Sequence, residues 1–413
     1  MRLLFVSQVY FPEPVWKPHD LASGLVELGH EVTVLTAVPN HPHNRFYEGY
    51  RRALLQEEQI DGVRVVRVLH YPYHGRSAGK RTASYLSFAL LASTIGPIKI
   101  GKPQLIWAFQ SPLTVGIPTL WLKVLRGVPV VYEIQDLWPE TLAATGMVSS
   151  RAVIAAVGVI ASGLYHTVDA LVVQSPGMKQ NLVAKGVSPG KVSVIPNWAD
   201  EDLYRPVEPD PRLAAAEGMA GRFNVVFAGN LGSAQGLRTL LDAAILLRDH
   251  PRIQFVFVGD GVDEPTLRDT TRALGLRNVL YLGRRPAHEM PGLFALASAL
   301  IVHLKKDPLF AMTIPSKIPA YLASGRPIVA AVEGDAAAVV RDVQAGIVCP
   351  PEDPEAIARA LVTLDEMSVA ARERLGRNGR ETFLRSYARR QLIPLYENLF
   401  FRVARAAGRS VEI

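Results

Sequence analysis

The feature that most constrains this chain is an alternation of short apolar runs and helix-length segments that occurs twice. The runs are rich in β-branched and aromatic residues, and the segments between them have amphipathic spacing. This pattern is typical of parallel sheets covered by helices on both faces. It stops at residues 199–221, which carry three prolines and predict a linker followed by a short helix. We therefore predict an α/β protein of two Rossmann-like domains that face a cleft at the carboxyl ends of their strands.

The predicted domains are residues 1–198 and 222–385, joined by the linker 199–221. Strands of the first domain are predicted at 3–7, 31–36, 63–69, 105–109, 129–134, 170–174 and 192–195. Those of the second are predicted at 223–228, 253–259, 279–282, 299–304, 327–331 and 346–349. Helices fit between the latter at 237–248, 263–274, 288–297, 316–323 and 354–364, and residues 385–413 are predicted to be helical and basic. With 413 residues and 49% hydrophobic content, the chain is long enough for two cores.

Two glycine-rich turns of the second domain predict a phosphate site. The run VVFAGNLGSAQG at 225–236 ends a strand and leads into a helix, so its amides could bind a diphosphate. The turn VGDG at 258–261 ends the next strand at the same predicted edge. The alternative is that these glycines only permit tight turns. The spacing matches neither a Walker loop nor a dinucleotide fingerprint.

A lysine opens the predicted helix at 316–323. Lys317 follows Pro315 and Ser316, and a cation in the first turn of a helix opposes the helix dipole. An anion at this position is one interpretation, and a solvated lysine is the other.

The basic residues are concentrated in the first domain. The net charge is +7, and residues 62–132 contain no Asp or Glu but nine basic residues. Within this stretch, residues 82–98 are uncharged and broken by Ser, Gly and Pro, which is marginal for a membrane span. Either a basic-flanked helix lies in an anionic membrane interface, or a core helix has a solvated basic rim. Nucleic acid is not predicted as a partner, and a second uncharged run at 152–168 is interpreted as core.

The cysteine content and the N-terminal segment exclude further classes of protein. Cys349 is the single cysteine, which excludes a disulfide framework and a cysteine-based metal cluster. The N-terminal MRLLFVSQVYFPEP is interpreted as a strand and a proline loop, not as a signal peptide. We expect a cytoplasmic protein, peripheral on the inner face of the cell membrane.

Several segments together resemble the retaining glycosyltransferases of family 4, which have the GT-B fold. They resemble most the branch of capsule, colanic-acid and O-antigen enzymes that includes N-acetyl-fucosaminyltransferase-like proteins. The segments are FPEP, LGHEVTVLTAVPNHP, RFYEGYRR, VPVVYEIQDLWPETL, VIPNWAD, VVFAGNLGSAQGLRTLLDAA, FVFVGDG, TIPSKIPAYLASGRPIVA and AGIVCPPEDPEAIARAL. Of these, the DLWP segment is the most specific, and the matches span nearly the whole chain.

The resemblance implies a role for particular residues. Asp136 would point toward the acceptor, and Lys317 would lie beneath the donor diphosphate as the second catalytic residue. The donor-binding residues would be Gly229, Asn230, Leu231, Gly232, Gln235, Gly259, Asp260, Arg285, Pro315, Ser316 and Lys317. The acceptor side would comprise Trp16, Lys17, Asp136 and Trp138. Residues 386–413 would cross back onto the first domain, and neither a metal nor a cofactor is expected.

The chain departs from the family pattern at several contact positions. Met312 and Ala320 stand where the family has two glutamates, and Asn230 and Gln235 replace the cations that clamp the diphosphate. For Asp136 the alternative is a carboxylate that caps its own loop.

The expected reaction is transfer, with retention, of a hexosyl or N-acetylhexosaminyl group from a nucleotide-diphosphate donor, expected to be UDP-linked. The acceptor would be a saccharide or a lipid-diphosphate-linked saccharide of a bacterial surface polysaccharide. The alternatives are a sugar-nucleotide 2-epimerase of the same fold and a non-catalytic partner of another transferase.

Overall fold

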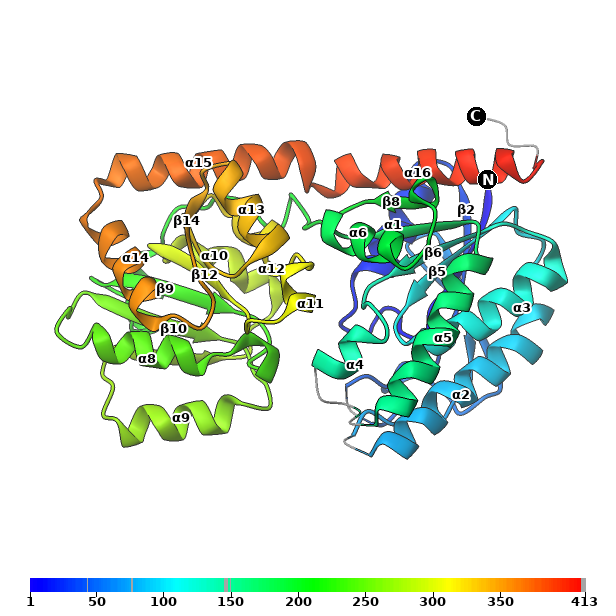
Figure 1. The fold of residues 1–413 in the computed structure, drawn as a ribbon, viewed down its shortest axis with the longest axis horizontal. Coiled ribbons are helices and arrows are strands. Elements are labelled where there is room, and N and C mark those ends of the chain that lie inside the picture. The colour runs from blue at the N-terminus through cyan, green and yellow to red at the C-terminus, as the bar shows by residue number, and fades with distance from the viewer. Residues whose placement is uncertain (43, 76, 145–147, 149, 410–413) are drawn as a thin grey trace. The chain divides into compact units, whose positions relative to one another are not determined.

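The computed structural model describes residues 1–42, 44–75, 77–144, 148 and 150–409. The chain forms two compact units (Figure 1). Unit 1 comprises Met1–Gln174, Met178–Ile195 and Ile393–Ile413, and unit 2 comprises Ser175–Gly177 and Pro196–Leu392. The segment predicted as a linker, 199–221, thus belongs to unit 2, where it contributes the short helix α7 (Pro211–Ala216).

Unit 1 is built on an eight-stranded sheet in the order β3-β4-β2-β1-β5-β6-β7-β8. All neighbouring strands are parallel except β3, which pairs antiparallel with β4 at the edge. The strands are β1 (Arg2–Val6), β2 (Glu31–Ala37), β3 (Leu55–Ile60), β4 (Val63–Val68), β5 (Leu105–Gln110), β6 (Val130–Ile134), β7 (Ala170–Val173) and β8 (Val192–Val194). Every residue of β5 and β6 is buried, as expected for parallel strands covered on both faces.

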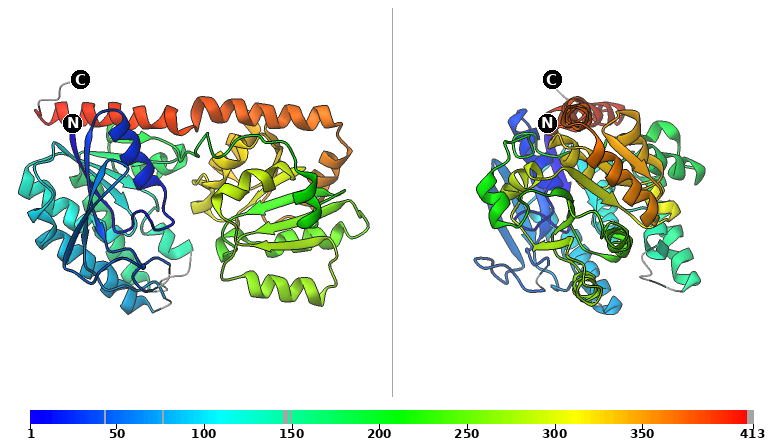
Figure 2. Two further views of the ribbon diagram at one scale, coloured as in Figure 1. Left: turned by 180° about the vertical axis from the view of Figure 1, so that it is seen from behind. Right: turned by 90° about the vertical axis from the view of Figure 1, so that its left-hand side faces the viewer.

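The helices of unit 1 form two layers. Because parallel crossovers are right-handed, the connection from β1 to β2 and the connections running from β4 through β8 lie on opposite faces. One layer therefore contains α1 (Lys17–Glu27), and the other contains α2 (Ala78–Thr94), α3 (Gly116–Arg126), α5 (Arg151–Thr167) and α6 (Pro176–Ala184). Figures 1 and 2 show α2, α3 and α5 side by side along the sheet.

Unit 2 is built on a six-stranded parallel sheet in the order β11-β10-β9-β12-β13-β14. Its strands are β9 (Phe223–Ala228), β10 (Ile253–Val258), β11 (Val279–Gly283), β12 (Ala299–His303), β13 (Ile328–Ala331) and β14 (Gly346–Cys349). Its other helices are α8 (Arg238–Leu246), α9 (Glu264–Ala273), α10 (Met290–Ala295), α11 (Pro308–Ala311), α12 (Lys317–Ala323), α13 (Gly334–Asp342), α14 (Pro354–Glu366) and α15 (Val369–Ser386). Successive residues of β9 enter two separate cores, since strand side chains alternate between faces.

The C-terminal region consists of two helices. α15 ends at Ser386, and α16 (Arg389–Ala406) follows after a two-residue break, so the segment predicted as one helix from 385 is interrupted. From Ile393 onward, α16 belongs to unit 1. There the Tyr396 hydroxyl donates to Glu133 (2.8 Å), and Phe400 packs edge-on against Phe5.

All thirteen predicted strands are present, with ends that differ by at most two residues. The prediction missed β3, whose sequence LQEEQI is too polar to be recognised as a strand. It was also wrong about residues 152–168, which form most of α5 but are largely exposed, including Val153, Val159 and Ile160. No helix in the described residues is both long enough and apolar enough to cross a bilayer.

Candidate functional site

The two predicted glycine turns of unit 2 pack directly against each other. Gly229 follows β9 and Gly259 follows β10, and both have a left-handed backbone, with φ of 135° and 137°. A Cβ atom on Gly259 would lie 2.0 Å from the carbonyl oxygen of Gly229, so only glycine fits. The strand ends thus form one continuous backbone surface, as the sequence indicated.

Hydrogen bonds between the turns engage some of the amides that were expected to bind phosphate. The Gly229 N–H donates to the carbonyl of Val258 (2.9 Å), and the Leu231 N–H donates to that of Asp260 (2.8 Å). Neither amide is available to a ligand. The N–H groups of Asn230 and Gly232 have no partner among the described residues, so these two remain as donors.

Lys317 extends from the start of α12 to the first glycine turn. Its Nζ lies 3.6 Å from the position that a Cβ on Gly229 would occupy, and 3.8 Å from the centre of the Phe227 ring. It donates to Oε1 of Gln235 (2.6 Å). Burial lowers the pKa of this ammonium to about 7. No described residue forms an ion pair with Lys317, so its positive charge has no carboxylate counterpart.

His303, at the end of β12, holds the turn that carries Gln235. Its Nδ1 lies 2.6 Å from the Gln235 carbonyl, and its Nε2 accepts the N–H of Glu352 (3.0 Å). The second bond requires an unprotonated Nε2, so the ring is neutral and donates from Nδ1. Burial also lowers the His303 pKa. The sequence analysis missed His303 because nothing in its local pattern links it to a residue 68 positions earlier.

The remaining predicted donor residues surround these turns less closely. Asp260 is exposed, with Oδ2 3.9 Å from Nη1 of Arg284. Arg285, predicted to bind the donor, pairs with Glu217 (2.7 Å) and more loosely with Glu289 (3.5 Å). Pro315 and Ser316 immediately precede α12.

The two positions at which the family has glutamates and this chain has other residues lie in or near the same region. Ala320 lies within α12 and packs against the core of unit 2. Met312 ends α11. Neither position has a carboxylate that could bind ribose hydroxyls.

In unit 1, Asp136 follows β6 at the carboxyl edge of the sheet and is exposed. The protein around it limits hydration of its carboxyl and raises the pKa. The amide of Gln110 donates to the Asp136 carbonyl (3.0 Å), whereas the carboxylate has no hydrogen bond to a described residue. The loop-capping alternative therefore has no support among the described residues.

The other predicted acceptor-side residues have different surroundings. Lys17 is buried, and its Nζ lies 2.5 Å from Oε1 of Glu133. Burial lowers its pKa, and the Glu133 carboxylate opposes that shift. Trp16 precedes α1 and is 40% exposed, and Trp138 is partly buried.

Glu133 is the centre of a buried cluster that the sequence analysis missed. Besides Lys17, its carboxylate accepts hydrogen bonds from four neutral side chains: Trp107 (3.2 Å), Gln135 (2.6 Å), Gln174 (3.3 Å) and Tyr396 (2.8 Å). The cluster joins α1, three central strands or their ends, and α16.

Glu13, in the FPEP segment, performs a similar role at the loops after β1 and β2. Its carboxylate accepts the N–H groups of Tyr10, Asn40 and His41, at 3.0, 2.8 and 2.8 Å. Burial raises its pKa, against the effect of these three donors. Nearby, His74 Nε2 lies 2.7 Å from Asn40 Oδ1. These loops fix polar groups at the same sheet edge as Asp136.

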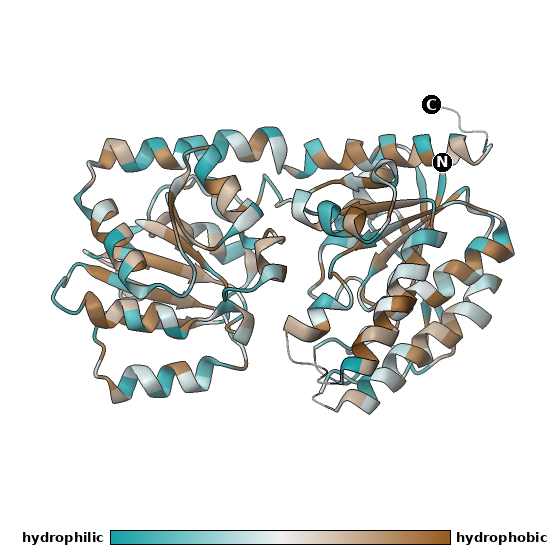
Figure 3. Ribbon diagram, in the orientation of Figure 1, coloured by the Kyte–Doolittle hydropathy of each residue, from teal (hydrophilic) through white to brown (hydrophobic). Residues whose placement is uncertain are grey.

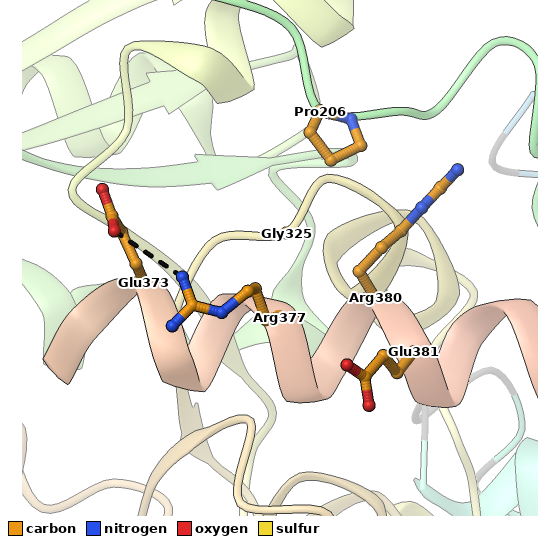
Figure 4. A pocket seen from close by; sticks show the side chains of 6 residues that line it. All are labelled: Pro206, Gly325, Glu373, Arg377, Arg380 and Glu381. Atoms are coloured by element: carbon orange, nitrogen blue, oxygen red, sulfur yellow. Dashed lines mark ion pairs between the residues drawn. The ribbon is translucent and has the colours of Figure 1, made fainter. Parts of the chain in front are cut away.

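A pocket of about 240 Å³ in unit 2 lies apart from the predicted site (Figure 4). It is lined by Pro206, Gly325, Glu373, Arg377, Arg380 and Glu381. Figure 4 shows Arg377 turned toward Glu373, and Arg380 donates to two backbone carbonyls. Three of its charged side chains, those of Glu373, Arg377 and Arg380, are therefore engaged within the protein. Among the described residues, no group of three or more His, Cys, Asp or Glu is arranged to hold a metal ion.

Two α/β units, each built on a largely parallel sheet, form the GT-B fold, which similar solved structures share. A sucrose-phosphate synthase from Thermosynechococcus elongatus has a TM-score of 0.78 at 18% identity, over 98% of this chain and 100% of that one. Anabaena Alr3699/HepE, solved with UDP-glucose, has a TM-score of 0.73 at 18% identity, over 97% of this chain and 100% of that one.

Two family models match the sequence of this chain. Residues 16–198 match the glycosyl transferase 4-like domain, and residues 222–366 match the glycosyl transferases group 1. The chain is therefore built of two glycosyltransferase domains, of which the second matches the group 1 glycosyltransferases. It is 28% identical to WcaI of Escherichia coli (strain K12), named as a candidate colanic acid biosynthesis glycosyl transferase, over 74% of this chain and 76% of that protein.

Proposed function

We propose that this glycosyltransferase uses a nucleotide-diphosphate sugar, UDP-linked, and transfers its hexosyl or N-acetylhexosaminyl group with retention of configuration. The acceptor is a saccharide or a lipid-linked saccharide of a bacterial surface polysaccharide. The relative named for colanic acid biosynthesis and the UDP-glucose complex of a structural neighbour support this choice of substrates.

The observation that carries the proposal is the ammonium of Lys317. It is partly withdrawn from water, which is unfavourable for a cation, and no described carboxylate compensates it. A diphosphate bound at the turns would supply the missing negative charge. The free N–H groups of Asn230 and Gly232 would add hydrogen bonds to its oxygens.

The same arrangement suits the chemistry of the reaction. As the glycosidic bond breaks, negative charge grows on the leaving diphosphate, and a fixed cation stabilises that charge. With retention, the departing phosphate itself takes the acceptor proton on the same face of the sugar, so no side-chain nucleophile is needed. In this scheme Asp136, exposed and not engaged in loop capping, orients the acceptor hydroxyl.

We further assign the protein to the cytoplasmic side of the cell membrane, as a peripheral protein. The acid-free basic stretch at 62–132 supports this, because basic side chains are attracted to anionic lipid surfaces. A lipid-linked acceptor would be met at that surface.

The proposal is tested first by thermal-shift screening against UDP-, GDP- and dTDP-sugars. We expect stabilisation by a UDP-sugar, and then transfer of its labelled sugar to a lipid-linked saccharide with the donor's anomeric configuration. An isomerised nucleotide sugar formed without acceptor would instead identify a 2-epimerase. Donor binding without transfer or hydrolysis would favour a non-catalytic partner, and an inverted product would contradict retention.

A further inference from the structure

The outer side of one helical layer in unit 1 is unusually apolar. Half of the large hydrophobic side chains that are exposed in the described chain lie on α2, α3, α5 and the short 3-10 turn Gly96–Ile98. We call these ten side chains the apolar face: Leu86, Leu90, Ile98, Ile117, Trp121, Val124, Leu125, Val153, Val159 and Ile160. Val124 is 79% exposed and Val159 is 74% exposed.

The three helices form one continuous layer. α2 packs along α3, and the Arg126 guanidinium at the end of α3 donates to the carbonyl of Pro97 (2.6 Å). α3 meets α5 closely, because a Cβ on Gly116 would lie 2.6 Å from Cδ2 of Leu164. Figure 1 shows the three helices adjacent, and Figure 3 shows apolar positions along them.

Helical spacing places the apolar face on the side away from the sheet. On α3 the exposed residues are Ile117, Trp121, Val124 and Leu125, which is one stripe at i, i+4, i+7 and i+8. Leu122 and Thr119, on the opposite side of α3, are buried. The exposed stripe is therefore additional to the side that packs on the core.

The helices and the turn that carry the apolar face contain basic residues and no acidic ones. α2, α3, α5 and residues 96–102 contain no Asp or Glu. Their basic residues lie near the ends of the helices: Lys80, Arg81, Lys99, Lys102, Lys123, Arg126 and Arg151. Lys99 and Lys123 pair with Glu57 and Asp169 outside these elements, whereas Lys80, Arg81, Lys102 and Arg151 form no ion pair with a described residue.

The exposed apolar side chains and the basic residues around them together indicate which kind of partner binds this surface. Ten exposed large hydrophobic side chains on adjacent helices indicate an interaction surface. A second copy of the chain on the same patch would bring Lys80, Arg81, Lys102 and Arg151 against their own counterparts, and these helices carry no acidic residue to offset that charge. An anionic bilayer offers phosphates to the basic ends and hydrocarbon to the apolar middle, and a tryptophan such as Trp121 is a typical interfacial residue.

We propose that the apolar face inserts into the interface of an anionic lipid bilayer while the basic residues around it contact lipid phosphates. The inference rests on the proposed function, since a lipid-linked acceptor gives the enzyme a reason to bind a membrane. It goes further because it predicts that hydrophobic side chains, including those of α5, insert into the bilayer. Attachment by charge alone would instead be abolished by high salt.

The test is co-sedimentation of the full chain with phosphatidylglycerol-containing vesicles, at low and high salt and without substrates. We expect binding that weakens but persists at high salt. Val124→Glu with Ile160→Glu should lower vesicle affinity by about tenfold or more, because both side chains would carry charge into the interface. The matched control is Leu246→Glu with Val369→Glu, exposed apolar residues of unit 2, which should bind vesicles as the wild type does.

Trp121 supplies an independent signal. Brominated lipids should quench part of the tryptophan fluorescence of the wild type, and Trp121→Phe should remove that part. Thermal melting verifies that each variant is folded.

The proposal is overturned if the wild type does not bind these vesicles, or if the double variant binds them unchanged. It is equally overturned if the variant only abolishes a concentration-dependent dimer, which would make a second copy the occupant. Transfer to a soluble saccharide acceptor is measured in parallel. Activity that persists without vesicle binding would reject the membrane face alone, and vesicle binding without activity would reject the proposed function alone.

Discussion

Lys17 in unit 1 and Lys317 in unit 2 occupy similar places and have different surroundings. Each is the first residue of a helix, and burial lowers the pKa of each. Lys17 meets a carboxylate, Glu133, at 2.5 Å. Lys317 meets an amide oxygen and an aromatic ring.

We interpret this difference as one between a structural cation and a functional cation. A buried lysine with a carboxylate is compensated within the fold and cross-links its elements. A lysine that the fold leaves without an anion, beside two glycine turns, is placed for a ligand that brings its own negative charge. Removing the first should affect stability, and removing the second should affect the reaction.

The largest effect expected from this comparison is on stability. Lys17→Met leaves Glu133 buried without its cation and should cost about 3–5 kcal/mol of the free energy of unfolding. Urea denaturation of the full chain measures this. Lys17→Met combined with Glu133→Gln should recover part of the loss, because a neutral amide can still accept from Tyr396 and Trp107. An unchanged unfolding midpoint in the single variant would mean that the pair does not stabilise unit 1.

The complementary variant in unit 2 should affect catalysis. Lys317→Ala is expected to lower kcat/KM by about 10²–10³-fold, the range for loss of a group that stabilises transition-state charge. Steady-state kinetics with the donor found by screening measures it. Lys305→Ala is the matched control, since Lys305 is an exposed lysine close to Gly236. If Lys305→Ala has the larger effect, the assignment of the diphosphate to Lys317 is wrong.

Asp136 should show a smaller and more selective effect. Asp136→Asn preserves the shape of the side chain but removes the charge that would orient the acceptor hydroxyl, so turnover should fall by roughly a hundredfold. Donor affinity should stay near the wild-type value, because the proposed donor site lies in unit 2. Kinetics and a donor titration are compared on the same variant. A large loss of thermal stability would instead support the loop-capping alternative.

Much of the fold could be predicted because parallel strands that are buried on both faces appear in the sequence as short apolar runs. That is true of β5, β6, β9 and β10. It is not true of β3, an edge strand with four polar or charged side chains in a row. The exposed side of α5 was missed for a related reason, since an uncharged helix has the same sequence pattern whether it faces protein or lipid.

The candidate site could be predicted only where its residues are close in sequence. The paired glycine turns were found because each follows a strand end. The different surroundings of Lys17 and Lys317 could not be predicted, because they depend on residues far apart in the sequence. Tyr396 contacts Glu133 across 263 positions, and Gln235 contacts Lys317 across 82 positions. Long-range packing, and not local pattern, decides which buried lysine has an internal counter-charge.

The central claim is that the Lys317 ammonium binds the donor diphosphate, and proton uptake on binding tests it most directly. With a pKa of about 7 in the free protein, Lys317 is mostly neutral at pH 8, and an adjacent diphosphate should raise that pKa and bring a proton onto it. Donor affinity should therefore decrease as the pH rises above 7. Calorimetry at pH 8 in two buffers of different ionisation enthalpy, with the intact nucleotide sugar and no acceptor, should show uptake of about one proton. Lys317→Met should bind more weakly and take up none. Binding of the wild type without proton uptake, or the same uptake in the variant, would contradict the account.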